Sequence, residues 1–286
     1  MDSQTKGTLL MVVSATGFGT IAVLGKLAAQ VGMSIPTMLA WRFLFGGLII
    51  WVVLGARGDL ELLRGRDLAA AVAIGGGWYA VASGFYFWGL EFMTAGLVAI
   101  VIYTYPAFVL LLSLLFLEEV ITRRTVGALA LAFAGVGLVT GVRPAGASVV
   151  GVVVVLGAAL TYAAYYVTGH VALEDVGSAT LAAHVVPAAA TSFLLFGLAT
   201  GRLAVPATTY EWSLVAAFAT IGCAIPLTAF FAGLSHIGAS RASIISSLEP
   251  VTAVLLGAAV LGEPVTVPTA VGGALILAGV VLLQLE

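Results

Sequence analysis

Glu249 is the only acidic residue near the middle of a long apolar segment of this chain. A carboxylate in such a setting is costly to bury and usually faces a cavity or a partner. We therefore expect Glu249 either to contact a ligand ammonium or to titrate as a coupling group. In the alternative interpretation it is structural, bonded to Ser246 or paired with Arg42. Pro250 follows it and has no N–H, which leaves a backbone carbonyl free near Ser246.

Two basic residues also lie in or beside apolar segments. Arg42 is a candidate carboxylate binder, or a helix-packing base whose long side chain reaches the membrane surface. Lys26 lies nearer the end of its segment, where an interfacial role or a partner acid competes with substrate contact. Together with Glu249, these residues are the candidates for coupling or charge pairing.

Tyrosine, tryptophan and serine side chains gather in the same kind of segment. Tyr79, Ser83 and Tyr86 follow an i, i+4, i+7 spacing and therefore share one helix face. Rings this deep are not explained by the aromatic belt at a membrane surface. They are suited to wall a cavity for an apolar or aromatic solute; packing between helices, or for the serines bonds to carbonyls one turn back, is the alternative. The predicted substrate-binding residues are Tyr79, Trp78, Ser83, Tyr103, Tyr162, Ser243 and Ser246.

The segments that hold these residues have the composition of membrane helices. Hydrophobic residues make up 62% of the 286-residue chain and charged residues only 8%, which excludes a soluble domain. A spanning helix needs about 20 apolar residues. Ten such runs occur, at Gly7–Ala29, Pro36–Leu54, Leu68–Leu90, Ala95–Phe116, Arg124–Gly141, Val149–Gly169, Ser178–Thr200, Trp212–Leu234, Ala239–Leu261 and Thr266–Leu283. The predicted fold is an all-α membrane protein of ten transmembrane helices.

Basic residues are unevenly distributed over the short connections between these runs. Under the positive-inside rule, the connections richer in Lys and Arg are cytoplasmic, which places both termini in the cytoplasm. The richer set carries Lys6, Arg57, Arg64, Arg66, Arg123, Arg124 and Arg241, and the opposite set carries Lys26, Arg143 and Arg202. A net charge of -2 argues against a nucleic-acid partner, and a single cysteine excludes a disulfide framework or a Cys-rich metal site.

The chain repeats itself at an offset of 144 residues. Pro106 aligns with Pro250, since 106 + 144 = 250, and the register continues without a gap. The two prolines are candidate hinges in their helices. Further identities join Glu119, Thr122 and Thr125 to Glu263, Thr266 and Thr269. We expect the two glutamates to cap or brace the turn into the following helix, which the threonines start.

This duplication has a geometric consequence. It divides the chain into five-helix repeats at 1–143 and 144–286. Because five is an odd number, the second repeat enters the membrane from the opposite side, and the repeats are predicted to be inverted. Many secondary transporters place their substrate near the midplane between such halves.

Two long motifs carry a resemblance to a known family. Residues 104–139 read TYPAFVLLLSLLFLEEVITRRTVGALALAFAGVGLV, and residues 248–282 read LEPVTAVLLGAAVLGEPVTVPTAVGGALILAGVVL. Over its whole length the chain resembles EamA-type carriers of the drug/metabolite transporter (DMT) superfamily, and most of all bacterial amino-acid and metabolite exporters, including the aromatic amino-acid type. The resemblance implies gradient-driven export of amino acids or related small metabolites across the bacterial inner membrane by alternating access. It also implies no cofactor, and it places the helices of Tyr79, Tyr103 and Tyr162 around the substrate.

Two other classes of function remain as alternatives. A channel or facilitator for small solutes is compatible with inverted repeats. An intramembrane enzyme is disfavoured, because all four aspartates fall outside the predicted spans and no HExxH or GxSxG pattern occurs. His184 is the only histidine within a span, and we expect it to be a satisfied packing residue. The expected partners are a small-molecule substrate and the lipid bilayer, and the sequence is compatible with a monomer.

Overall fold

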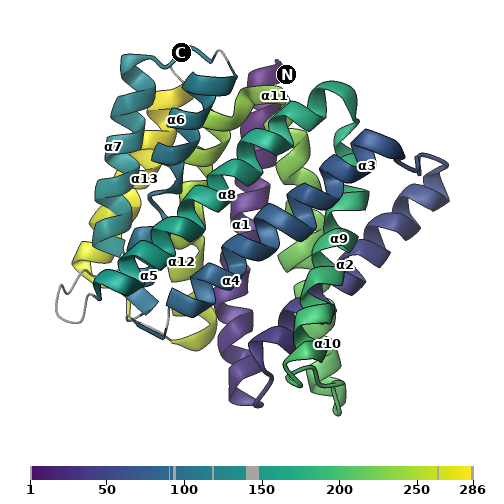
Figure 1. Cartoon of the computed structure of the whole chain (residues 1–286). Helices are drawn as coiled ribbons and strands as arrows, with labels where there is room; N and C mark the ends of the chain where they lie inside the picture. Colours follow the sequence, from purple (N-terminus) through teal and green to yellow (C-terminus); the bar gives the residue numbers. More distant parts are fainter. Residues whose placement is uncertain are drawn as a thin grey trace.

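The computed structural model is an all-helical bundle (Figure 1). It describes residues 2–89, 91–92, 95–117, 119–139, 148–262 and 264–284, and these ranges contain no strand. The elements are α1 (Ser3–Gln30), α2 (Ile35–Arg57), α3 (Gly65–Val72), η1 (Ala73–Tyr79), α4 (Ala80–Gly89), α5 (Ala95–Ile102), α6 (Tyr105–Phe116), α7 (Arg123–Val139), α8 (Val149–Asp175), α9 (Ser178–Ala199), α10 (Thr209–Ala219), η2 (Thr220–Ala224), α11 (Ile225–Ile245), η3 (Ser246–Leu248), α12 (Glu249–Leu261) and α13 (Val267–Gln284). The turns η1 and η2 are π-helical, and η3 is a 3-10 turn.

Six helical stretches of the described chain are long and apolar enough to cross a membrane. They are 3–30, 35–57, 65–86, 149–175, 178–199 and 209–261; Tyr105–Phe116 and Val267–Leu283 are shorter apolar helices. The prediction of an all-helical membrane protein is therefore confirmed, whereas the count of ten spans stays a prediction. The predicted span ends at Leu90 and Gly141, and the division between residues 143 and 144, lie outside the described residues.

The longest stretch is bent rather than straight. Its 53 residues exceed the roughly 20 that one crossing needs. At Gly238 the backbone turns to φ 77° and ψ 171°, a conformation that favours glycine. The predicted eighth and ninth spans, 212–234 and 239–261, lie on either side of this bend.

Glycines in η1 let two helices approach closely. A Cβ on Gly75 would collide with the backbone of Val185 in α9, and the Ser192 hydroxyl donates to the Gly76 carbonyl at 3.0 Å. The π-helical turn also shifts the side chains that follow it relative to a regular α-helix. Tyr79 lies at the end of this turn, so its direction depends on both features.

Contacts between helices follow the 144-residue repeat. A Cβ on Gly233 would meet Met11, and a Cβ on Gly89 would meet Val155, where 233 − 89 = 144 and 155 − 11 = 144. The same offset relates the packing of α1 on α11 and α12 to the packing of α8 on α4 and α6. The two halves therefore present matching surfaces to each other.

The outer pair α7 and α13 shows the relative direction of two equivalent helices. Gly127 faces Leu282, whereas Gly135, two turns later, faces Gly272. Because the partner number falls as the α7 number rises, α7 and α13 run antiparallel. The two ends of the chain lie at the same end of the bundle (Figure 1).

Candidate functional site: a tyrosine-walled cavity with opposite charges

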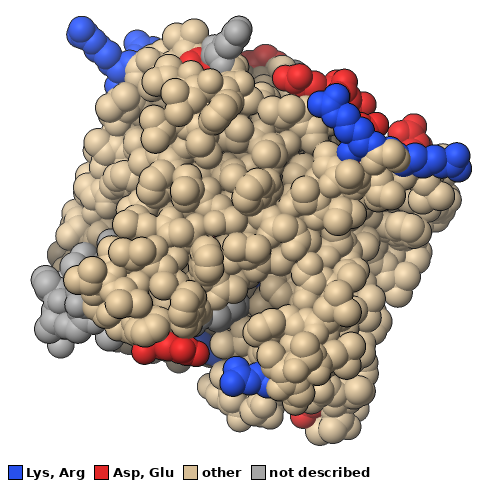
Figure 2. Space-filling view, in the orientation of Figure 1, with Lys and Arg blue, Asp and Glu red and all other residues tan. Residues whose placement is uncertain are grey.

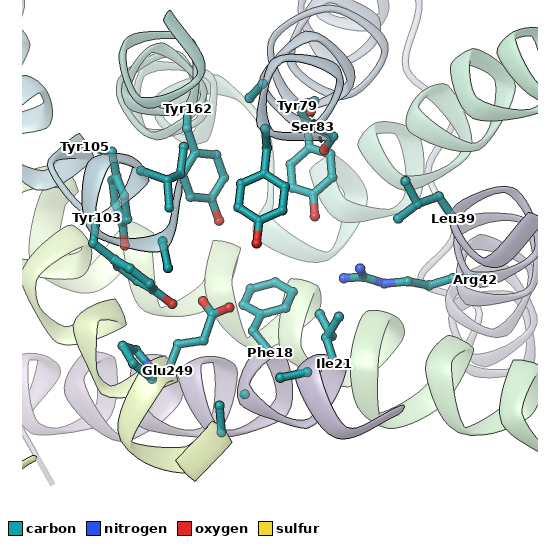
Figure 3. A pocket seen from close by; sticks show the side chains of 18 of the residues that line it. Phe18, Ile21, Leu39, Arg42, Tyr79, Ser83, Tyr103, Tyr105, Tyr162 and Glu249 are labelled. Atoms are coloured by element: carbon teal, nitrogen blue, oxygen red, sulfur yellow. Dashed lines mark hydrogen bonds between the residues drawn. The ribbon is translucent and has the colours of Figure 1, made fainter. Parts of the chain in front are cut away.

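A cavity of about 470 Å³ lies among α1, α2, α4, α5, α8 and α12 (Figure 3). Pockets for small molecules commonly measure about 300–1,000 Å³. The lining residues are Phe18, Gly19, Ile21, Ala22, Leu39, Arg42, Tyr79, Ala82, Ser83, Tyr86, Ala99, Ile102, Tyr103, Tyr105, Tyr162, Glu249, Pro250, Ala253 and Val254. Both halves of the chain contribute to this wall.

Tyrosines form one side of the cavity, and the hydroxyl groups of Tyr103 and Tyr162 point into the space (Figure 3). The ring of Tyr105 meets the ring of Tyr162 edge-on at 4.9 Å between centroids, and Tyr79 lies 6.2 Å from Tyr162. Such edge-to-face packing is favourable and fixes the rings. Cavity wall and aromatic packing, which the sequence presented as alternatives, are here properties of the same residues.

Glu249 and Arg42 enter the cavity from different helices. The carboxylate of Glu249 comes from α12 and lies beside the hydroxyl of Tyr103, whereas the guanidinium of Arg42 reaches in from α2 (Figure 3). Within the described chain, no ion pair joins the two. The cavity therefore offers an anionic group and a cationic group at separate places.

Arg42 is only 4% exposed, yet two of its nitrogens are without a hydrogen-bond partner in the described structure, namely Nε and Nη2. Its Cζ lies 4.8 Å from the centroid of the Phe43 ring, a cation–π contact. The side chain extends into the cavity instead of snorkelling to the surface (Figure 3). Both nitrogens are buried as well as unbonded, so the hydrogen-bonding capacity of this charged group is incompletely used.

Four of the predicted substrate-binding residues line the cavity, and three do not. Tyr79, Ser83, Tyr103 and Tyr162 lie in the wall. Trp78 is 41% exposed on the other face of its helix, and Ser243 and Ser246 are buried behind the wall. Each serine hydroxyl donates to a carbonyl of its own helix: Ser83 to Tyr79, Ser243 to Ser240 and Ser246 to Ala242. Lys26 is exposed on α1 and is not a lining residue.

The repeat points to two wall residues that are not in the predicted substrate-binding set. Tyr105 occupies the position of Glu249 in the first half, since 105 + 144 = 249, and each directly precedes a proline. Phe18 occupies the position of Tyr162, since 18 + 144 = 162. Applying the offset to the predicted site residues would have found both.

The prolines lie where their helices are interrupted. Pro106 stands in the first turn of α6, after a break at residues 103–104. Pro250 stands in the first turn of α12, after the 3-10 turn η3. Both breaks border the cavity, because Tyr103, Tyr105 and Glu249 are lining residues.

Glu119 has a different partner from the one predicted. Its carboxylate accepts the backbone N–H groups of Ala239 at 2.9 Å and Ser240 at 3.2 Å, so it caps the helix that starts after Gly238. The turn into α7 is capped by Thr122, whose hydroxyl accepts the N–H of Thr125 at 3.1 Å. Local sequence favoured the nearby turn, whereas the bend at Gly238 exposes donors that only tertiary packing brings to Glu119. Glu263, its counterpart, lies outside the described residues.

His184 is a packing residue, as predicted. Its Nε2 accepts the N–H of Leu63 at 3.2 Å, and its Nδ1 lies 2.8 Å from the carbonyl oxygen of Thr180. Both ring nitrogens are therefore satisfied. The described residues hold no cluster of three or more His, Cys, Asp or Glu side chains able to bind a metal ion.

Comparison with known proteins identifies the family of this chain. The chain belongs to the EamA-like transporter family, whose profile matches it twice, over residues 5–141 and 149–285. The two matches begin 144 residues apart, since 149 − 5 = 144, which is the offset of the internal repeat. The protein is thus a multi-pass membrane transporter of the DMT superfamily, a class of proteins that are not enzymes.

Two similar relatives are named as uncharacterized transporters. The uncharacterized transporter YcbK of Bacillus subtilis (strain 168) is 25% identical over 277 residues, covering 90% of this chain and 86% of the relative. An uncharacterized transporter of Archaeoglobus fulgidus is 28% identical over 238 residues, or 80% of each chain. A solved crystal structure superposes with a TM-score of 0.84 at 20% identity, covering 99% of this chain and 97% of the other, which is a likeness of fold.

Proposed function

We propose that this transporter exports amino acids, or related small zwitterionic metabolites, by alternating access through the tyrosine-walled cavity. The observation that carries the proposal is that a carboxylate, Glu249, and an incompletely bonded guanidinium, Arg42, line the same cavity without contacting each other. A buried charge is stabilised when a partner satisfies it. The carboxylate of an amino acid would bind at the guanidinium of Arg42, which lines the cavity, and its ammonium group would face Glu249.

The remaining wall favours an apolar or aromatic side chain on this substrate. Phe18, Tyr79 and Tyr162 present ring faces and edges to the cavity. Aromatic rings bind apolar groups by area burial and pack edge-to-face with other rings. Because neither charged residue has a charged counterpart in the other half, where Val186 and Tyr105 occupy the equivalent positions, the substrate would bind in one orientation.

Inverted repeats would provide the alternating access. Three observations support this inversion: α7 and α13 pack antiparallel, contacts exchange between the halves at the 144-residue offset, and the two chain ends lie together (Figure 1). Halves related in this way can rock against each other around a fixed site.

Cytoplasmic termini in a bacterial inner membrane fit the distribution of charge. Figure 2 shows most of the visible Lys and Arg side chains at the end of the molecule where Figure 1 places the chain ends. The cavity extends along α1 from Phe18 to Ala22, and from Tyr79 at the end of η1 to Tyr86 in α4, away from that end. The space-filling surface is hollowed at this opposite end (Figure 2). In this orientation the cavity would face the outside of the cell.

Transport by purified protein in liposomes tests the proposal. A panel of labelled amino acids and nucleobases is offered to preloaded vesicles, each with and without a proton gradient. We expect saturable counterflow of amino acids, competition by aromatic ones and no uptake of nucleobases. Linear flux without counterflow would identify a channel or facilitator instead, and uptake of nucleobases alone would overturn the substrate class.

Glu249→Gln tests the role of the carboxylate. The variant keeps the size of the side chain and removes its charge, so affinity for amino acids should fall about tenfold or more, as expected for a lost charge-assisted contact. Uptake assays from pH 5.5 to 8.5 measure both affinity and pH dependence. Transport and pH dependence identical to those of the wild type would show that Glu249 is structural.

A further inference from the structure

Tyr166 lies behind the cavity wall and connects it to the segment that carries Glu249. Its side chain is 1% exposed and does not line the cavity. Its hydroxyl donates to the Ser246 hydroxyl oxygen at 2.9 Å, and the Tyr105 hydroxyl lies 3.3 Å from it. Tyr105 in turn lines the cavity and donates to the carbonyl of Ser243 at 3.2 Å. Tyr105, a wall residue of the first half, and Tyr166, a residue of α8, are thus both hydrogen-bonded to the segment just before Glu249.

Ser246 is the first residue of the turn that sets the direction of the Glu249 side chain. Residues 246–248 form the 3-10 turn η3, in which the N–H of Glu249 bonds the carbonyl of Ser246. Pro250 has no N–H to offer that carbonyl, so the regular α-helical bond is absent here. The Ser246 hydroxyl, meanwhile, donates to the carbonyl of Ala242 at 3.0 Å and accepts from Tyr166.

The geometry of this turn has a large effect on the carboxylate. A 3-10 helix turns about 120° per residue and an α-helix about 100°, so three residues in the other form would rotate Glu249 by about 60°. The rise would change by about 1.5 Å over the same three residues. Either change would move the carboxylate away from Tyr103 and from its present place in the cavity.

We propose that Tyr166 is a positioning residue that holds η3 through Ser246 and so directs Glu249 into the cavity. Tyr166 thereby sets the preference of the transporter for substrates with an ammonium group. This inference rests on the proposed function for its effect on transport. The hydrogen-bonded brace itself does not depend on what the substrate is.

Tyr165 provides a matched control. It is the neighbouring residue of α8, it is also 1% exposed, and both rings pack against Phe230, at 5.3 Å for Tyr165 and 4.8 Å for Tyr166. The Tyr165 hydroxyl, however, is buried with no hydrogen-bond partner in the described structure. Tyr165→Phe and Tyr166→Phe therefore each remove one hydroxyl group from an equally buried ring. Only Tyr166→Phe also removes a hydrogen bond.

The transport test compares L-phenylalanine with 3-phenylpropionate, which lacks the ammonium group. The wild type, both variants, Glu249→Gln and the double variant Tyr166→Phe/Glu249→Gln are reconstituted in liposomes. Tyr166→Phe should raise the KM for L-phenylalanine about 3- to 10-fold, the effect of one lost hydrogen bond, and leave competition by 3-phenylpropionate unchanged. Tyr165→Phe should stay within about twofold of the wild type for both compounds, and Tyr166→Phe should add nothing once Glu249 is Gln.

Hydrogen exchange tests the brace without any substrate. Mass spectrometry of peptides covering residues 244–252 in detergent should show faster exchange in Tyr166→Phe than in the wild type or Tyr165→Phe. Equal exchange in the two variants, or equal weakening of both compounds in transport, overturns the inference. Faster exchange together with a wild type that transports no amino acid leaves the brace in place and overturns the proposed function.

Discussion

A guanidinium in a membrane interior is stable only when its donors are used, and Arg42 keeps two nitrogens without a partner in the described structure while being 4% exposed. Glu249 stands across the same cavity and does not pair with it. This unbalanced arrangement is costly for an empty structural site but is useful for binding a zwitterion. Under the proposed function, specificity would therefore lie in two charges kept apart by aromatic side chains.

Arg42→Gln separates binding from packing. We expect the affinity for amino acids to fall about 10- to 100-fold, because hydrogen bonds to charged groups contribute roughly 1.5–3 kcal/mol. Thermal stability in detergent should stay unchanged or rise, because an incompletely paired buried charge is removed. Arg57→Gln, an exposed change in the last turn of α2, serves as the control. A large loss of stability with unchanged affinity would assign Arg42 to helix packing.

At the scale of elements, helix breaks distinguish the segments around the cavity from the outer pair α7 and α13. The π-turns η1 and η2, the 3-10 turn η3 and the bend at Gly238 all belong to segments next to the cavity or behind its wall. Each break leaves backbone groups that need other partners. In this chain those partners come from distant segments, as Ser192 for Gly76 and Glu119 for Ala239 show.

Glu119→Ala measures the value of one such partner. It leaves the N–H groups of Ala239 and Ser240 without their acceptor, which should destabilise the protein by about 1–2 kcal/mol, the cost of a lost helix cap. The melting temperature in detergent should fall by a few degrees. Glu174→Ala, at an exposed position near the end of α8, should change it little. The same melting temperature for both variants would show that the cap contributes nothing.

Pro106→Ala tests the hinge at the start of α6. An alanine at this position can donate the missing backbone bond, so the helix should become continuous and the melting temperature should rise slightly. If this segment is a hinge of the proposed transport cycle, we expect slower turnover with nearly unchanged KM, because a continuous helix resists bending. Turnover equal to that of the wild type, with the same cysteine accessibility along α6, would remove the hinge.

At the scale of the whole molecule, the proposal requires the two proline helices to cross the membrane in opposite directions. Val120 follows α6 and is 86% exposed, and Val265 follows α12 and is 47% exposed. In a Cys223→Ser background, Val120→Cys should react with an impermeant maleimide only from the cytoplasmic side and Val265→Cys only from the outside. Cys223 is fully buried in the native protein, so it would itself contribute little labelling. Labelling of both positions from one side would contradict inversion and, with it, alternating access between matched halves.

Composition and register were sufficient for the class of this protein. Apolar runs of spanning length define membrane helices because lipid requires every backbone group to bond within its own segment. The glycine contacts repeat at the 144-residue offset, as the contact of Gly89 with Val155 and its counterpart in the other half show. Close approach of two helices requires small residues at fixed places, so the repeat in sequence becomes a repeat in packing. Spacing placed Tyr79 and Tyr86 on one helix face, and the family resemblance singled out Tyr103 and Tyr162; all four line the cavity.

Packing between distant segments settled what spacing left open. Helices that are apolar all round give no signal for which face meets a cavity and which meets lipid. Sequence spacing therefore placed Ser243 and Ser246 in the wall, whereas the fold buries them behind it with Tyr166. It also assigned Glu119 to the nearest turn, because the donors freed at Gly238, 119 residues away (238 − 119 = 119), exist only in the folded bundle. The composition of this chain specifies membrane helices, and contacts between them assign the role of each polar side chain.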